Sequence, residues 1–264
     1  MAPRIAIPMP HFSDTAYAER AIPQYENAVV LAGGEPVRVA LDQTAAQVQR
    51  IVERCDGILL PGSKADIDSV RFHATRSLHT AAADPRRDAM DDLLLRDAYE
   101  FRKPILGICY GLQGLNVYRG GSLIQHIPDF LPEETRARIN HEAGKKVAVA
   151  HSVEIESKSR LAEIVDADGR SSGPQTRRPL VIPVNSSHHQ SADAIGDGLR
   201  IVARCPDDGI IEALEGTAPD HFVLAVQWHP ERSVQQDAAS LAIFRALVEA
   251  ASLHREMAAR QAMP

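Results

Sequence analysis

The 264-residue chain is poor in cysteine, in aromatic residues and in long apolar runs. Its three cysteines are an odd and sparse set, which argues against a disulfide framework and favours a reducing compartment. No segment approaches the ~18 consecutive apolar residues that a membrane-spanning helix needs, and the apolar run at the amino terminus is too short for a signal peptide. We therefore expect a cytoplasmic protein that binds no membrane.

The chain also lacks basic blocks and nucleotide-binding glycine patterns. No run of lysine or arginine is longer than two residues and the net charge is -6, so we expect no nucleic-acid partner. The pairs Gly33-Gly34 and Gly120-Gly121 lack a phosphate-loop context and are better explained as helix ends, so we expect no cofactor. The remaining partner is a small molecule. The length fits a single domain over residues 1–264 and leaves the oligomeric state open, a homodimer included.

The first half of the chain alternates short apolar segments with helical patterns. Buried strands are indicated at 4–8, at 36–41, at 57–62 where the strand runs into a turn, and just before Cys109. Helices are indicated by a pattern through residues 25–32 that stops at Gly33-Gly34, at 44–54 and at about 84–103. This order predicts right-handed crossovers and an α/β fold, with a mostly parallel, doubly wound sheet of the flavodoxin-like kind and helices on both faces.

The second half is richer in strands. Residues 146–157 alternate as an antiparallel strand does, and three more strand patterns occur at 199–205, 209–216 and 221–228. We expect them to extend the sheet. Residues 166–179 resemble an exposed loop, and about 234–259 are predicted to form a helix with Leu241, Phe244 and Val248 facing inward.

One cysteine stands between two glycines where a strand passes into a helix. Gly107-Ile-Cys109-Tyr-Gly111 is the cysteine counterpart of the Gly-x-Ser-x-Gly nucleophile elbow. In such a turn the cysteine is expected to be exposed at the carboxyl end of the strand, and the dipole of the following helix favours its thiolate. The alternative is a buried structural cysteine in a tight strand-to-helix turn. We expect the other two cysteines, Cys55 and Cys205, to be core residues.

The best-placed base among the eleven histidines is His229. It ends an apolar strand, is held extended by Pro230, and has Glu231 two residues further on. A carboxylate so close can orient the imidazole and stabilise its charged form. The alternative for this pair is an ion pair at a strand end.

These elements have a recognisable order: an LPG turn, Gly-x-Cys-x-Gly-x-Gln, an Asn-Ser-x-His loop and His-Pro-Glu. In this the chain resembles the class I glutamine amidotransferase superfamily and, within it, the γ-glutamyl-γ-aminobutyrate hydrolase family, the peptidase-like branch. The resemblance covers about residues 4–250. Its most specific matches are ICYGLQGLNVYRGGSL, VNSSHHQ and VQWHPE.

The resemblance implies a role for each matching residue. Cys109 would be the nucleophile, His229 the acid/base and Glu231 the carboxylate that orients it. The substrate would be a small γ-glutamyl amide, hydrolysed through a cysteine thioester to glutamate and an amine. The oxyanion hole would consist of the amides of Gly62 and Tyr110, and the γ-glutamyl end would be bound by Gln113, Asn185, Ser186, Ser187 and His188.

Two other functions are compatible with these motifs. The first is a glutaminase subunit of an amidotransferase, which would deliver ammonia to a separate synthetase. No synthetase domain is present in this sequence, which favours the hydrolase. The second is a non-catalytic relative that only binds a ligand, and the intact set of cysteine, histidine and glutamate argues against it.

Residues 63–83 form a long connection without periodicity, which predicts a functional loop. It leaves directly from the predicted oxyanion turn, and four of its side chains could pair with a carboxylate on the amine half of a substrate. The alternative is that they point into solvent. These specificity candidates are Arg71, His73, Arg76 and His79.

A metal site is not expected from the sequence. His188 and His189 are adjacent, and neighbours in an extended segment point in opposite directions, so they do not share an ion without two further ligands. Arg87 and Asp88, near the start of a predicted helix, are interpreted as a structural pair.

Overall fold

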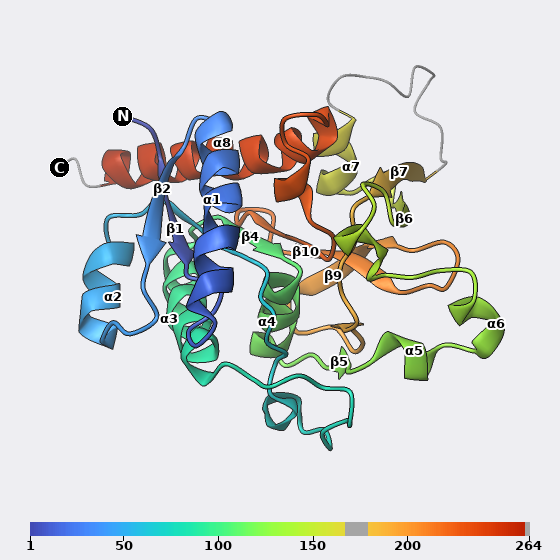
Figure 1. The fold of residues 1–264 in the computed structure, drawn as a ribbon. Helices are drawn as coiled ribbons and strands as arrows, with labels where there is room; N and C mark the ends of the chain where they lie inside the picture. The colour runs from blue at the N-terminus through green and yellow to red at the C-terminus, as the bar shows by residue number, and fades with distance from the viewer. Residues whose placement is uncertain (167–178, 262–264) are drawn as a thin grey trace.

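The computed structural model describes residues 1–166 and 179–261, and a nine-stranded sheet runs through this part of the chain. The strand order is β2-β1-β3-β4-β11-β10-β9-β6-β7 (Figure 1). The first five strands are mutually parallel, as the alternating pattern predicted. They are β1 (Arg4–Pro8), β2 (Glu35–Val39), β3 (Gly57–Leu60), β4 (Ile105–Ile108) and β11 (Val223–Val226).

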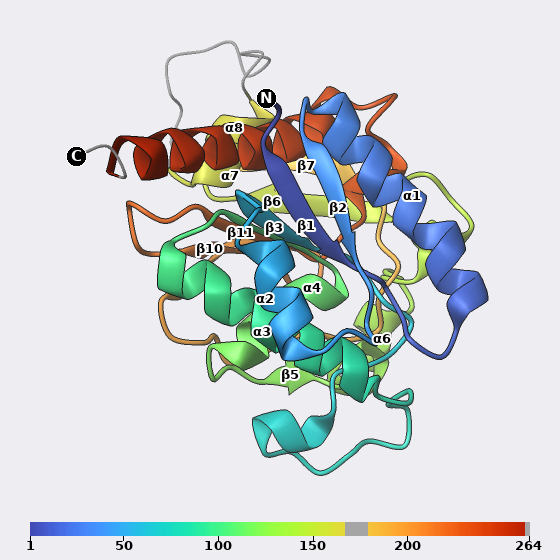
Figure 2. The same ribbon diagram turned by 90° about the vertical axis from the view of Figure 1, so that its left-hand side faces the viewer.

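Helices cover both faces of the sheet, which confirms the predicted fold class (Figure 2). One face packs against α1 (Thr15–Leu31), α7 (Arg160–Val165) and α8 (Ala238–Gln261). The other packs against α2 (Ala45–Val52), α3 (Pro85–Phe101) and α4 (Tyr110–Tyr118). The inner strands β3, β4 and β11 are buried on both sides, so their sequences are continuous apolar runs, whereas the edge strand β2 is partly exposed and carries Glu35 and Arg38.

The antiparallel extension contains four strands: β10 (Ile211–Gly216), β9 (Leu199–Arg204), β6 (His151–Ile155) and β7 (Leu180–Val184). The strand β7, which carries Pro183, was not predicted from the sequence. At the end of the strand order a proline is tolerated, because one side of an edge strand needs no ladder hydrogen bonds. β6 also begins later than predicted, at His151.

Shorter elements connect these layers. β5 (Leu123–Ile124) pairs with β8 (Ser191–Ala192), and α5 (Ile127–Phe130) and α6 (Glu133–Arg136) follow β5. Single 3₁₀ turns occupy η1 (Ser69–Phe72), η2 (Ala143–Lys145) and η3 (Pro230–Arg232). None of the described helices is both long and apolar enough to cross a membrane.

Two sequence expectations need correction here. The last helix begins at Ala238 rather than near 234, and Leu241 is only partly buried, whereas Phe244 and Val248 are buried as predicted. For the segment 63–83, the alternative of a purely solvated loop does not hold, because Ile67 is fully buried. The loop predicted at 166–179 lies almost wholly outside the described residues.

Candidate active site

Cys109 occupies a strained turn between β4 and α4. Its φ of +53° and ψ of -104° are unusual for a residue with a side chain, and such strain persists only where the surroundings enforce it. The amide of Cys109 donates to the carbonyl oxygen of Val226 at 2.8 Å, which fixes the turn to β11. A β-carbon on Gly111 would lie 2.2 Å from the carbonyl oxygen of Leu60, so only glycine lets α4 approach β3 this closely.

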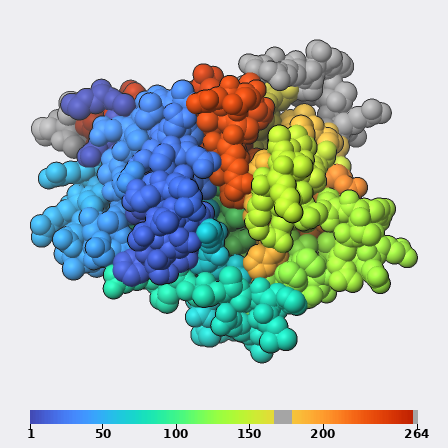
Figure 3. All heavy atoms as spheres, in the orientation of Figure 1, coloured from blue at the N-terminus to red at the C-terminus, as the bar shows by residue number. Residues whose placement is uncertain are grey.

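The cysteine side chain is more buried than its position in an elbow led us to expect. Cys109 is 6% exposed and packs with the core residues around Trp228. It lines a pocket of about 490 Å³, in whose walls later segments of the chain take part. Figure 3 shows this face, with atoms of α4 recessed between the amino-terminal segments, the segment after β11 and residues near 145. A sequence pattern does not reveal such a cover, because its parts come from distant segments.

His229 follows β11, which pairs with β4 in the register Val226 opposite Ile108. Parallel neighbours end at the same edge of a sheet, so the residues after the two strands meet there. His229 and Cys109 both line the pocket, and a β-carbon on Gly62 would touch both, at 3.1 Å from Cε1 of His229 and 3.6 Å from Cβ of Cys109.

The imidazole of His229 is held by Glu231, whose Oε1 lies 2.7 Å from Nδ1. Both side chains are buried. Burial disfavours the imidazolium, but the charges of Glu231 and of the Cys109 thiolate outweigh it and raise the pKa of His229 to about 9. The surroundings of His229 therefore favour a charged imidazole near neutral pH.

The amide of Gly62 makes another contact than the oxyanion-hole role that the resemblance implied. The amide of Gly62 donates to Tyr25 Oη at 3.1 Å, so this amide is already engaged. Burial raises the pKa of Tyr25 well above its usual value, which keeps the hydroxyl protonated and able to donate in turn. Tyr110 is the first residue of α4, and a helix leaves that amide without an intrahelical partner. The Tyr110 amide thus remains a candidate oxyanion donor.

The predicted structural pair of Arg87 and Asp88 does not form, and each of the two residues has other partners. Arg87 forms its ion pair with Asp91 at 2.7 Å, not with Asp88. Asp88 instead accepts from the Tyr110 hydroxyl at 2.6 Å and pairs with Arg71 at 2.8 Å. On a helix, residues four apart lie on one face whereas adjacent ones diverge, which explains the exchange of partner.

Three of the five predicted γ-glutamyl binders line the pocket: Gln113, Ser187 and His188. The other two, Asn185 and Ser186, are not among its lining residues. The Asn185 side-chain amide donates to three carbonyl groups between residues 144 and 148, at 2.9–3.2 Å, so it holds that segment in place.

None of the four specificity candidates lines the pocket. Arg71 is directed to Asp88 and Asp92, and Arg76 donates to the carbonyl groups of Thr80 and Ala81. His79 stacks on His126, and His73 caps the 3₁₀ turn η1 in a left-handed conformation. We no longer assign these residues a part in specificity.

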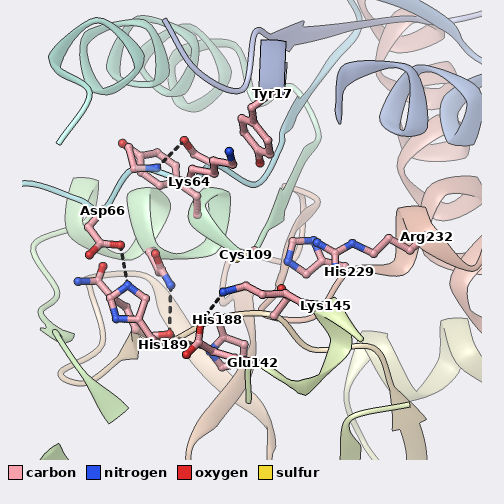
Figure 4. A pocket seen from close by; sticks show the side chains of 16 residues that line it. Tyr17, Lys64, Asp66, Cys109, Glu142, Lys145, His188, His189, His229 and Arg232 are labelled. Carbon is pink, nitrogen blue, oxygen red and sulfur yellow. Dashed lines mark hydrogen bonds and ion pairs between the residues drawn. The ribbon is translucent and has the colours of Figure 1, made fainter. Parts of the chain in front are cut away.

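Other charged residues surround the pocket in their place (Figure 4). Lys64 and Asp66 belong to the same connection as the four candidates but lie nearer its start, where the departure from the LPG turn could have indicated them. Glu142 and Lys145 come from a segment without a recognisable pattern, and they pair with each other. Arg232, next to Glu231, donates to Asn185 Oδ1 at 2.9 Å.

Fold and site together define a class I glutamine amidotransferase-like protein. The Peptidase C26 family model matches residues 6–231, and the chain belongs to that family. It is 32% identical over 238 residues to the gamma-glutamyl-gamma-aminobutyrate hydrolase of Escherichia coli K12, covering 88% of this chain and 86% of that one. It is 37% identical over 229 residues to a provisionally named glutamine amidotransferase of Mycobacterium tuberculosis, covering 86% and 66%.

Solved structures share the fold at low sequence identity. The glutaminase domain of Trypanosoma brucei CTPS with bound acivicin superimposes with a TM-score of 0.57 at 17% identity, covering 95% of this chain and 94% of that one. A protein of Thermoplasma acidophilum that is provisionally named as part of a GMP synthase gives a TM-score of 0.63 at 16% identity, covering 98% of both chains. At these identities the likeness concerns the fold alone.

Proposed function

We propose that this protein is a cysteine-dependent hydrolase of small γ-glutamyl amides, such as γ-glutamyl-γ-aminobutyrate, and that it releases glutamate and an amine. The observation that carries the proposal is the position of Cys109 on a strained elbow, in one pocket with a His229 imidazole that Glu231 holds at 2.7 Å. The family supports it, because a relative at 32% identity is named for this hydrolysis.

The proposed reaction begins with the Cys109 thiolate and the His229 imidazolium. The sulfur attacks the γ-carbonyl carbon, and the negative charge that develops on the carbonyl oxygen is stabilised by the Tyr110 amide at the start of α4. As the carbon–nitrogen bond breaks, His229 gives its proton to the departing amine. The neutral imidazole then takes a proton from water, the hydroxide attacks the thioester, and glutamate leaves as the thiolate and imidazolium are restored.

The charges of the pocket fit the glutamyl half of such a substrate. Free glutamyl groups carry an α-carboxylate and an α-ammonium, and the pocket presents cations on Lys64, Lys145 and Arg232 and anions on Asp66 and Glu142. Both signs within one cavity favour a zwitterionic ligand. The three free cysteines fit a reducing compartment, and we propose that the reaction takes place in the cytoplasm.

The test is a panel of γ-glutamyl amides with different amine halves, including glutamine, incubated with the purified full chain and scored by glutamate release. We expect turnover of at least one amide with an organic amine, and none with the Cys109→Ala variant. Glutamine hydrolysis that requires an added synthetase would favour the amidotransferase role. Absence of turnover across the whole panel would contradict the proposal.

A further inference from the structure

A second group of reactive side chains lies at the edge of the pocket, where His188 is one of the lining residues, and none of the bond-making or proton-transfer steps proposed above involves it. It consists of His141, His151, His188 and Glu212, which are all buried, and each offers one ligand atom within 4.8 Å of the others. They come from four places in the chain: the segment after α6, the start of β6, the loop before β8, and β10. In the sequence only His188 and its neighbour His189 stood out as a pair, whereas the fold brings three further ligands to His188.

The distances from Glu212 to the three imidazoles are close to those between neighbouring ligands of a metal centre. Oε1 of Glu212 lies 3.1 Å from Nδ1 of His141, 3.4 Å from Nε2 of His151 and 3.5 Å from Nε2 of His188. In a tetrahedral zinc site with bonds of about 2.0–2.1 Å, neighbouring ligand atoms are about 3.3–3.4 Å apart. The three measured separations lie close to this value.

The outer nitrogen of each ring determines what the inner nitrogen can do. Nδ1 of His151 lies 3.1 Å from the carbonyl oxygen of Ser152, and Nδ1 of His188 lies 2.9 Å from that of Gln190. A carbonyl oxygen only accepts, so each outer nitrogen carries the hydrogen and each neutral ring turns a lone pair inward. Nε2 of His141 is 2.7 Å from the carboxylate of Asp208, which orients that ring as well.

In their neutral forms His151 and His188 therefore turn lone pairs toward the same carboxylate oxygen of Glu212, which is a repulsive arrangement unless a cation lies between them. The three inner nitrogens and both oxygens of Glu212 make no hydrogen bond within the described part of the chain. A single added proton would relieve only one of the three contacts.

We propose that His141, His151, His188 and Glu212 bind one zinc ion. Three imidazoles and one carboxylate are ligands that Zn²⁺ prefers, and four protein ligands leave no open position, which is typical of a structural site. Asp208 and the two carbonyl groups orient the rings from outside, as the partners of zinc-bound histidines do. The ion would hold His188, and with it the adjacent pocket wall, against β6 and β10.

The structure also offers a matched control within the same chain. His79, His126 and Asp129 form another group of potential ligands, but two of the three are exposed. Nδ1 of His126 already faces Nδ1 of His189 at 3.3 Å. A variant at His126 therefore removes a histidine from a competing group and leaves the four-residue cluster intact.

Zinc binding is first tested on the wild-type full chain. Protein treated with a chelator and shown to be folded is titrated with Zn²⁺, and separately with Co²⁺, whose visible absorption reports tetrahedral geometry. We expect one equivalent to bind, the tetrahedral Co²⁺ spectrum to appear, and the melting temperature to rise with zinc concentration. Folded protein that binds no stoichiometric metal, with an unchanged melting temperature, would overturn the proposal.

Substitutions then locate the ion. Glu212→Gln and His151→Ala should abolish stoichiometric binding, His126→Ala should retain it, and Asp208→Asn should weaken the affinity by about 10- to 100-fold. Wild-type affinity in folded Glu212→Gln or His151→Ala would exclude this site. If those two do not fold, Asp208→Asn decides, because an unchanged affinity there would also contradict the assignment. The readout is metal content, so the result is independent of the proposed hydrolase activity.

Discussion

Arg87 donates a hydrogen bond of 2.6 Å from Nη2 to the carbonyl oxygen of Pro61. The two residues belong to α3 and to the turn after β3, and Arg87 is fully buried. The same guanidinium donates to the carbonyl oxygen of Pro10 at 3.1 Å and pairs with Asp91. Because Gly62 follows Pro61 and lies against His229, Arg87 is a positioning residue for this side of the pocket.

Replacement of Arg87 should destabilise the protein strongly. Arg87→Met leaves Asp91 buried without its partner, and we expect the free energy of unfolding to fall by about 3–5 kcal/mol. Chemical denaturation measures this change. Arg87→Met with Asp91→Leu removes both charges and should recover part of the loss. A double variant less stable than Arg87→Met would show that the pair itself is not the source of the effect.

Substitutions at Cys109 should separate chemistry from backbone strain. Cys109→Ala and Cys109→Gly both remove the nucleophile, so glutamate release should fall at least about a thousandfold in each. Glycine adopts the positive φ without strain, and we expect Cys109→Gly to be more stable than Cys109→Ala by about 1 kcal/mol. The midpoints of urea unfolding test the order, and the reverse order would mean that the turn stores no strain.

Glu231 should set the alkaline limit of activity. The carboxylate favours the imidazolium, so Glu231→Gln lowers the pKa of His229 from about 9, and the alkaline limb of the kcat/KM profile should move to lower pH. His229→Ala should cost at least about tenfold more activity than Glu231→Gln, because a misoriented base is better than none. The exposed Glu163→Gln on α7 serves as a control with an unchanged profile. An unshifted limb in Glu231→Gln would contradict the role of this carboxylate.

The cations of the pocket, rather than those of the long connection, should determine substrate binding. Lys145→Met removes an exposed positive charge from the pocket, and we expect kcat/KM for γ-glutamyl amides to fall by a few-fold to about tenfold. Arg76→Met removes a positive charge outside the pocket and should leave kcat/KM unchanged. Comparison of the two variants on one substrate is the measurement. Equal losses of kcat/KM in the two variants would mean that the connection formed by residues 63–83 contributes to substrate binding as much as the pocket cations do.

The sequence by itself determined the elbow and the residues of the candidate base. An apolar strand, two glycines around Cys109 and a helical run are contiguous, so local conformational preferences and close packing specify the turn. His229 and Glu231 are two residues apart at a strand end, which places their side chains within reach whatever surrounds them. The parallel sheet followed from the alternating pattern, because strands linked by helices are joined by crossovers.

Only the tertiary structure decided what surrounds these residues. Cys109 is buried because distant segments cover it, and Tyr25 of α1 engages the Gly62 amide across the site. Two ligands of the proposed zinc site, His151 and Glu212, lie on predicted strands, whereas His141, His188 and the pocket cations lie on segments that carry no periodic signal. Their partners are set by the order of the antiparallel strands and by the paths of long connections. Such contacts form between residues far apart in the chain, where local propensity says nothing about which side chains meet.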